Sequence, residues 1–385
     1  MGRFRDALSA SGLQGIAEVK RRSPSVGELR AGADPAELAA SYERAGAAAV
    51  SILVDARFDG SWDDLRAARA AARLPLLAKG FFSTGEDLRV AREAGADAAL
   101  LILRDLDDEA ARRLLVAATE LGLDTLVEAH DAEDLGRATR LDAPVIGINA
   151  RDLSTFAIDR RAQLGLVASA PRDRIIVAES GIESRAQGAA AELAGADAIL
   201  VGSALMRATD PAQKLGELLS RPLVKVCGLT RAEDVAAAAG AGADMAGFVL
   251  AEGSPRRAEG VLPVPETMLA VSVEVGEPCE AEADLIQLYP REQGKVRGRD
   301  AVLLREGREV AKVLDLPWQE PDPAHLERAR AANGRIMLAG GLGPDNVRAA
   351  IDAVRPWAVD ASSALESAPG VKDHGLVRAY VEAAR

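Results

Sequence analysis

The chain has 385 residues, of which 48% are hydrophobic and only 3% are aromatic, and its net charge is −12. At about 150 residues per domain, this length favours two domains, with cores built from Ala, Val, Leu and Ile. The negative charge argues against a nucleic-acid partner or an anionic membrane surface.

Cysteine and histidine usage argues against a disulfide framework and against a metal site. Cys227 and Cys279 form no CxxC motif, and His130, His325 and His374 lack the spacing of metal ligands. The first residues carry no apolar signal-peptide segment, and no apolar run approaches the roughly 18 residues of a membrane span. We therefore expect a cytoplasmic protein without a membrane partner.

Short apolar segments alternate with helical patterns along the first half of the chain. Eight of them read as strands, at residues 15–20, 48–54, 75–79, 97–103, 124–128, 144–149, 174–179 and 197–202. Each is almost continuously apolar, which is typical of parallel strands buried on both faces. Eight strand–helix units predict an α/β fold in which residues 1–221 form a (β/α)8 barrel of the TIM type.

A second series of apolar segments follows without a flexible linker. Its eight predicted strands lie at residues 223–227, 245–250, 269–275, 284–289, 301–306, 309–315, 335–340 and 357–362. Only a short turn around Gly307 separates the fifth strand from the sixth, whereas parallel neighbours need a crossover of about a dozen residues. Residues 222–385 therefore predict a second TIM-type barrel in tandem with the first, but trimmed or irregular.

Polar residues end most strands of the first series, where such barrels place their reactive groups. They are Glu18, Lys20, Lys79, Glu128, Asn149, Arg151, Glu179, Ser180 and Ser203, the last preceded by Gly202. A single charged residue at a strand end is usually a solvated rim residue, but that interpretation does not explain the whole set. Neighbouring lysines should lower one another's pKa and a dry mouth should raise that of carboxylates, giving a proton donor and an acceptor near neutral pH. Gly181 and Gly202-Ser203 follow the last two strands, where these barrels bind phosphate.

Several motifs of the first half resemble those of indole-3-glycerol-phosphate synthases. IAEVKRRSPSVGEL, from Ile16, resembles the first-strand signature, and LLAKGFF, LVEA, IGINARDL, VAESGI and ILVGSALM follow in the family's order over residues 4–210. The resemblance implies that 1-(2-carboxyphenylamino)-1-deoxyribulose 5-phosphate is closed to indole-3-glycerol phosphate, with loss of CO2 and water. It implies no metal and no cofactor.

The same resemblance implies a role for individual residues. Lys79 would be the general acid of ring closure, and Glu128 would serve the later dehydration. Lys20 would hold a phosphate or carboxylate and assist proton transfer. The remaining positions would orient Lys79 or contact the substrate: Glu18, Asn149, Ser23, Arg151, Glu179 and Ser180, with Gly181, Gly202 and Ser203 at the phosphate.

Two departures from the synthase pattern suggest an alternative function. Gly80 stands where the family usually has an acidic residue. The family also normally has an N-terminal extension over the active-site mouth, and this chain begins just after it. Both departures fit a repurposed synthase with a changed substrate.

The second half resembles phosphoribosylanthranilate isomerases through VKVCGLTRAEDV, GSPRR, IMLAGGLGPDN and AVDASSALESAPGVKD. Without these motifs, Cys227 would be interpreted as a small buried hydrophobic residue. The resemblance implies that Cys227 is the general base and that Arg256 contacts the substrate carboxylate, and Asp315 is the best candidate for the general acid. The phosphate would lie at Gly340, Gly341, Ser362 and Ser363.

The isomerase half also departs from its family. Tyr289 replaces the usual histidine, and LPWQEPDP follows Asp315 in place of a glycine-rich loop that clamps phosphate. We therefore predict weak or absent isomerisation of N-(5-phosphoribosyl)anthranilate, with a non-catalytic structural remnant as the alternative. The sequence makes no prediction of oligomeric state.

Overall fold

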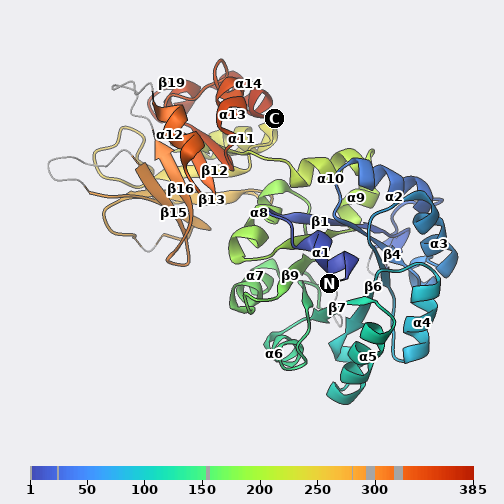
Figure 1. The fold of residues 1–385 in the computed structure, drawn as a ribbon. Helices are drawn as coiled ribbons and strands as arrows, with labels where there is room; N and C mark the ends of the chain where they lie inside the picture. The colour runs from blue at the N-terminus through green and yellow to red at the C-terminus, as the bar shows by residue number, and fades with distance from the viewer. Residues whose placement is uncertain (1, 24–25, 153–156, 280, 292–299, 316–323) are drawn as a thin grey trace. The chain divides into compact units, whose positions relative to one another are not determined.

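The computed structural model describes residues 2–23, 26–152, 157–279, 281–291, 300–315 and 324–385. The chain divides into two compact units, Met1–Glu183 with Gly188–Leu219, and Ser184–Gln187 with Ser220–Arg385. Each contains a closed barrel of eight strands (Figure 1). Among the described residues, no helix is long and apolar enough to cross a membrane.

The first barrel consists of eight parallel strands that follow one another around the ring in chain order. They are β1 (Gln14–Val19), β4 (Ala49–Leu53), β5 (Leu76–Lys79), β6 (Ala98–Ile102), β7 (Asp124–Ala129), β8 (Val145–Asn149), β9 (Ile175–Glu179) and β10 (Ala198–Val201). Each falls within one or two residues of a predicted strand, so the prediction of a (β/α)8 barrel is confirmed. A small hairpin, β2 (Arg22–Ser23) with β3 (Gly27–Glu28), follows β1.

Helices surround these strands (Figure 1). They are α2 (Pro35–Arg44), α3 (Trp62–Ala71), α4 (Gly85–Glu93), α5 (Asp108–Glu120), α6 (Ala132–Arg140), α7 (Arg160–Ser169), α8 (Arg185–Ala194), α9 (Ser203–Arg207) and α10 (Pro211–Leu219), with short 3-10 turns η1 (Ala56–Phe58) and η2 (Leu103–Asp105). Side-chain caps fix where several of them begin: Thr84 forms a capping box with Asp87, and Asp131 accepts a hydrogen bond from the first turn of α6. Their apolar faces pack on the strands through Leu and Ala.

A short N-terminal helix, α1 (Arg3–Leu8), closes one end of the first barrel. Phe4 and Leu8 are fully buried among inward-facing strand residues such as Leu126. The backbone amide of Arg5 donates a hydrogen bond to Asp124, at the start of β7. The N-terminal ends of the strands are therefore covered, and the candidate site lies at the opposite ends.

The second barrel also closes, but two of its strand pairings are antiparallel. Its strands are β11 (Leu223–Cys227), β12 (Met245–Val249), β13 (Leu269–Val275), β14 (Leu285–Tyr289), β15 (Asp300–Arg305), β16 (Arg308–Asp315), β17 (Ile336–Ala339) and β18 (Ala358–Ala361). β15 runs antiparallel to both β14 and β16. The turn between β15 and β16 holds Glu306 and Gly307 at positive φ (49° and 74°), as a two-residue hairpin requires. The prediction of an irregular second barrel is confirmed.

The other described elements of the second unit lie around this barrel. They are α11 (Ala232–Ala241), α12 (His325–Ala331), α13 (Val347–Val354), α14 (His374–Ala384), the turn η3 (Ser363–Leu365) and a small hairpin of β19 (Glu366–Ala368) and β20 (Val371–Lys372). The core on the outer side of the strands is largely aliphatic, with Phe248 and Tyr380 among its fully buried aromatic residues. The sequence LPWQEPDP, at residues 316–323, lies outside the described residues.

Candidate active sites

A cavity opens at the C-terminal ends of the strands of the first barrel. Its lining includes nearly all the residues predicted for this half: Glu18, Lys20, Ser23, Lys79, Glu128, Asn149, Arg151, Ser180, Gly181, Gly202 and Ser203. Glu179 lies just beneath it, only 1% exposed, and accepts a hydrogen bond from Lys79. Residues almost 200 positions apart in the sequence therefore line one cavity.

Lys79 lies at the centre of a buried network of charges. Its Nζ is 2.8 Å from Oε2 of Glu179 and 3.2 Å from Oε2 of Glu18. The other oxygen of Glu18 is 2.6 Å from Nζ of Lys20. Glu18 thus bridges two ammonium groups, and both lysine side chains keep about 15% exposure toward the cavity. A substrate entering the mouth would meet both amines.

The charges in this network shift one another's pKa. Burial would raise the pKa of Glu18, but Lys20 and Lys79 lower it to about 2. Burial raises the pKa of Glu179 to about 7, although Lys79 opposes the shift. Burial would lower the pKa of Lys79, but Glu179, Glu18 and Glu128 together raise it above its ordinary value. The expectation that neighbouring lysines lower one another's pKa is therefore wrong for Lys79, because three carboxylates face it.

Glu128 lies at the end of β7 in a different environment. Its Oε1 is 3.2 Å from Nε2 of His130, and Lys79 and Asn149 approach it from the cavity side. Burial would raise the pKa of Glu128, but the contacts with His130 and Lys79 lower it. Glu128 is therefore held as a carboxylate, whereas Glu179 titrates near neutral pH. Sequence reasoning missed His130, whose one signal was its place two residues after Glu128.

One end of the cavity is suited to an anion. Ser180 and Gly181 have positive φ (69° and 70°), and Gly202 and Ser203 begin α9. Arg151 and Arg207 line the same cavity. Burial lowers the pKa of Arg151, and the nearby charge of Arg207 lowers it further. Two neighbouring guanidinium groups, together with the backbone amides at the start of α9, produce a positive electrostatic field that favours a phosphate. Arg207 was not predicted, although it directly follows the ILVGSALM motif.

Apolar side chains line another part of the mouth. Val26, Phe81 and Ile158 line the cavity and are 52%, 43% and 43% exposed, which is unusual for large apolar residues. Phe81 stacks on Phe58, with ring centroids 6.4 Å apart. This apolar part suits a flat aromatic group, and it too was missing from the sequence prediction.

Gly80, the departure noted in the synthase motif, is explained by packing. A Cβ atom at this position would lie 2.9 Å from the ring of Phe82 and 3.0 Å from Val54. Phe82 in turn stacks on Trp62. An acidic side chain at position 80 would therefore require Phe82 to move.

In the second barrel, Cys227 ends β11 beside a fully buried lysine. Nζ of Lys225 donates hydrogen bonds to Gln287 at 2.6 Å and to Asp360 at 2.9 Å. Burial raises the pKa of the Cys227 thiol, although Lys225 opposes the shift. The thiolate that a general base requires is therefore disfavoured before substrate binds.

Asp315 lies at the end of β16 and belongs to the same buried hydrogen-bond network. The Tyr289 hydroxyl donates to Oδ2 of Asp315 at 2.7 Å and accepts from Nε2 of Gln287 at 2.8 Å. Tyr289 therefore occupies the space between the predicted acid and Gln287, which contacts Lys225. The structure connects Cys227 and Asp315 through these side chains.

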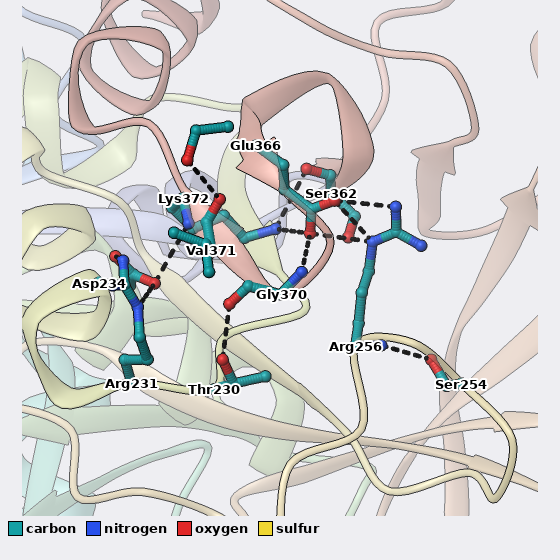
Figure 2. Close-up of polar contacts among 11 residues, drawn as sticks. Thr230, Arg231, Asp234, Ser254, Arg256, Ser362, Glu366, Gly370, Val371 and Lys372 are labelled. Carbon is teal, nitrogen blue, oxygen red and sulfur yellow. Dashed lines mark hydrogen bonds and ion pairs between the residues drawn. The ribbon is translucent and has the colours of Figure 1, made fainter.

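Arg256 is already paired with a carboxylate (Figure 2). Its guanidinium donates to Glu366 through Nε at 2.9 Å and contacts it through Nη2 at 2.8 Å. Lys372 donates to the same carboxylate at 2.8 Å and to the backbone oxygen of Ser362 at 3.1 Å. A Cβ atom on Gly228 would lie 2.7 Å from the Ser362 hydroxyl, so the loop after Cys227 and the loop after β18 approach closely.

The predicted phosphate residues of the second barrel follow two paired parallel strands. Gly340 and Gly341 come after β17, both with positive φ (89° and 67°), and Ser362 and Ser363 come after β18. Within the described part of the chain, no three His, Cys, Asp or Glu side chains converge in a way that could hold a metal ion.

Comparisons with known proteins match the two halves separately and together. The indole-3-glycerol phosphate synthase family model matches residues 2–218, and the N-(5'-phosphoribosyl)anthranilate isomerase model matches residues 322–383. The indole-3-glycerol phosphate synthase of Mycolicibacterium vanbaalenii is 45% identical over 215 residues, covering 56% of this chain and 79% of that protein. The crystal structure of TrpF from Jonesia denitrificans covers 43% of this chain and 97% of its own, at 31% identity and a TM-score of 0.35.

A further relative spans both barrels. The tryptophan biosynthesis protein TrpCF of Yersinia pestis is 34% identical over 422 aligned positions, covering 99% of this chain and 87% of that protein. The chain therefore belongs to the bifunctional family of tryptophan-biosynthesis enzymes that join an indole-3-glycerol phosphate synthase domain to a phosphoribosylanthranilate isomerase domain.

Proposed function

We propose that the first barrel closes 1-(2-carboxyphenylamino)-1-deoxyribulose 5-phosphate to indole-3-glycerol phosphate in the cytoplasm, with Lys79 as the general acid. The observation that carries this proposal is the placement of Lys79, an ammonium group facing the cavity and held by Glu179 and Glu18. An ammonium group fixed in a partly dry mouth stabilises a developing alkoxide without reorganising.

We propose one orientation for the substrate in this cavity. Its phosphate lies at the anion-binding end, with Gly181, Gly202 and Ser203 and near Arg151, and its aromatic ring lies against Phe81. In this orientation the sugar hydroxyls lie near Ser23 and Ser180, which also line the cavity. This orientation directs the ketone of the sugar toward the lysines.

Ring closure and dehydration then use different groups. As the aryl carbon bonds to the ketone carbon, the carbonyl oxygen takes a proton from Lys79, and the departing CO2 leaves its electron pair to the ring. Loss of water needs a proton for the leaving hydroxyl and a base for the proton that the substrate releases. Lys20, which lies in the cavity beside Glu18, would donate the first, and Glu128, held as a carboxylate, would accept the second. Glu18 and Asn149 orient these groups.

The test is the stoichiometry of the reaction. Purified full-length chain, incubated with the substrate and a metal chelator, should release one CO2 for each indole chromophore formed. Indole formation that stops on chelation, or CO2 release without indole, would contradict the proposed mechanism.

We propose that the second barrel isomerises N-(5-phosphoribosyl)anthranilate slowly. Cys227 would be the base, Asp315 the acid and Arg256 the contact for the anthranilate carboxylate. The phosphate would lie at Gly340, Gly341, Ser362 and Ser363. The pairing of Arg256 with the Glu366 carboxylate supports a site for a carboxylate, and the same pairing must rearrange when substrate binds.

The low rate follows from the state of the two reacting groups. Burial raises the pKa of the Cys227 thiol, and the Asp315 carboxyl group accepts a hydrogen bond from the Tyr289 hydroxyl that must rearrange before Asp315 can act on the substrate. A replacement of Tyr289 by His, the residue usual in the family, should increase isomerase turnover. A decrease would indicate that Tyr289 itself takes part in the reaction.

A further inference from the structure

The anion-binding end of the first cavity contains a turn that the barrel strands do not hold. Ser180, Gly181 and Ile182, which we call the anion turn, follow β9 and line the cavity. Within the described part of the chain, these three residues make no backbone–backbone hydrogen bond. The position of the anion turn must therefore depend on side chains.

Gln163 of α7 links the two strand ends beside this turn. Helix α7 lies against β8 and β9 (Figure 1), and Gln163 is only 1% exposed. Its Nε2 donates to the backbone oxygens of Ile148 at 2.7 Å and of Glu179 at 2.6 Å. Because carbonyl oxygens only accept hydrogen bonds, the NH2 group of Gln163 must face them. The Glu179 oxygen also accepts the N–H of Ala150 at 3.0 Å, so Gln163 is not needed to satisfy it.

Arg160, at the start of α7, extends this contact into the anion turn. Its Nη1 donates to the backbone oxygen of Gly181 at 3.3 Å and to that of Ser180 at 3.5 Å. A Cβ atom on Gly181 would lie 2.7 Å from Ile158 and 3.3 Å from Cγ of Arg160, so the turn packs directly on these residues. The two side chains from α7 thus hold the carbonyl oxygens of three consecutive residues, 179–181.

The direction of these carbonyl groups determines where the next N–H groups point. In a planar trans peptide, a C=O and the N–H that follows it point in opposite directions. Since the carbonyl groups of residues 179–181 face α7, the N–H groups of Ser180, Gly181 and Ile182 point away from it. Successive N–H groups in a turn form a concavity that binds anions. The contacts on one side of the turn therefore prepare its other side for a phosphate.

We propose that Gln163 and Arg160 are positioning residues of the synthase, which hold the anion turn so that its N–H groups converge on the phosphate of the substrate. Neither belongs to the described residues that line the cavity, so both act through the turn. This inference rests on the proposed position of the phosphate. Gln163 is neutral, so its replacement changes the position of the turn without changing the charge of the site.

The first test measures phosphate binding and does not need synthase activity. The chain contains two Ser-Gly pairs, Ser11-Gly12 and Ser180-Gly181. Labelling the full-length protein with ¹³C at serine carbonyls and ¹⁵N at glycine therefore isolates the amide signals of Gly12 and Gly181. Titration with inorganic phosphate should move the Gly181 signal, and the Gly12 signal is the internal reference.

Replacement of Gln163 by Leu should weaken this binding. We expect the midpoint of the titration to rise by about 10-fold or more, as when a hydrogen bond to a charged group is lost. Val167→Ala, which shortens a fully buried side chain of the same helix, is the matched control and should leave the midpoint unchanged. If Gln163→Leu does not fold, Gln163→Met carries the same prediction.

The outcomes of this titration separate the two proposals. A Gly181 signal that phosphate does not move in the unmodified protein would refute the proposed phosphate position itself. A midpoint that Gln163→Leu leaves unchanged would keep that position but overturn the positioning role. An equal rise in Val167→Ala would also overturn it, because loosening of α7 would then be the cause.

The second test uses turnover to separate positioning from a structural defect. Because the phosphate is held alike in the substrate and in the transition state, Gln163→Leu should raise KM by about 10-fold with kcat nearly unchanged. Arg160→Gln should raise KM further, since it also removes a positive charge. An unchanged KM, or a fall in kcat as large as the rise in KM, would contradict the proposal.

Discussion

Replacement of Lys79 by Met removes the ammonium group around which the first site is arranged. Loss of a general acid typically costs about 10²- to 10⁴-fold in rate, which corresponds to about 2.7–5.5 kcal/mol. Because Lys79 faces the cavity and the carbonyl oxygen gains charge only during ring closure, we expect the loss in kcat rather than in KM. Steady-state turnover followed by indole fluorescence measures it, and Lys214→Met, at a lysine of α10 paired with Glu217, is the control.

The same replacement removes a positive charge from beside two buried carboxylates. Glu179 loses its contact with Lys79 at 2.8 Å, whereas Glu18 keeps its contact with Lys20. Leaving a buried charge unpaired costs about 3–5 kcal/mol, but protonation of Glu179 avoids this cost. Its pKa is already raised to about 7 and should rise further, so stability is kept at low pH and lost as pH rises through that value. Chemical denaturation of the variant at pH 6 and pH 9 should show this difference.

Lys79→Arg separates charge from proton donation. Arginine keeps the positive charge and the ion pairs, but its guanidinium does not give up a proton in proteins. We expect near-normal stability and KM with a kcat as low as that of Lys79→Met. Near-normal turnover in Lys79→Met, or full turnover in Lys79→Arg, would refute the assignment of Lys79 as the general acid.

Three further predictions concern other parts of the first barrel. The pKa of Glu18 is lowered to about 2 from its ordinary 4.5, so this carboxylate contributes stability above pH 4.5 that is lost as the pH falls toward 2. Glu18→Gln should therefore flatten the pH dependence of stability in acid unfolding, and an unchanged slope would contradict this prediction. Arg207→Ala should raise the substrate KM several-fold with kcat nearly unchanged. An unchanged KM would show that the phosphate binds elsewhere. Gly80→Asp should lower the melting temperature because its Cβ meets Phe82 at 2.9 Å, and an unchanged melting temperature would show that Phe82 moves at no cost.

The positions of the strands and of the strand-end residues could be predicted because both follow from local patterns. Buried parallel strands are continuously apolar, and a barrel brings their C-terminal ends to one face. The antiparallel pairing of β15 was indicated by the short turn at Gly307, which excludes a crossover.

Contacts across the barrel could not be predicted in the same way. The pKa of Lys79 depends on Glu179, 100 residues away, and on how the side chains of β1, β5 and β9 are aligned. The pairing of Arg256 with Glu366 likewise joins residues 110 positions apart. His130 has no motif of its own, and its position behind Glu128 is visible only once α6 is packed against β7.

We propose that one chain carries two unequal active sites, a fast synthase and a slow isomerase. The most direct test measures kcat/KM for both substrates on one preparation of the full-length protein. We expect robust synthase turnover that is lost in Lys79→Met. Isomerase turnover should be lower by about 10²-fold or more, as expected when catalytic groups are misplaced by about 1 Å. A robust isomerase rate that disappears in Cys227→Ser, or the absence of synthase turnover, would contradict the account.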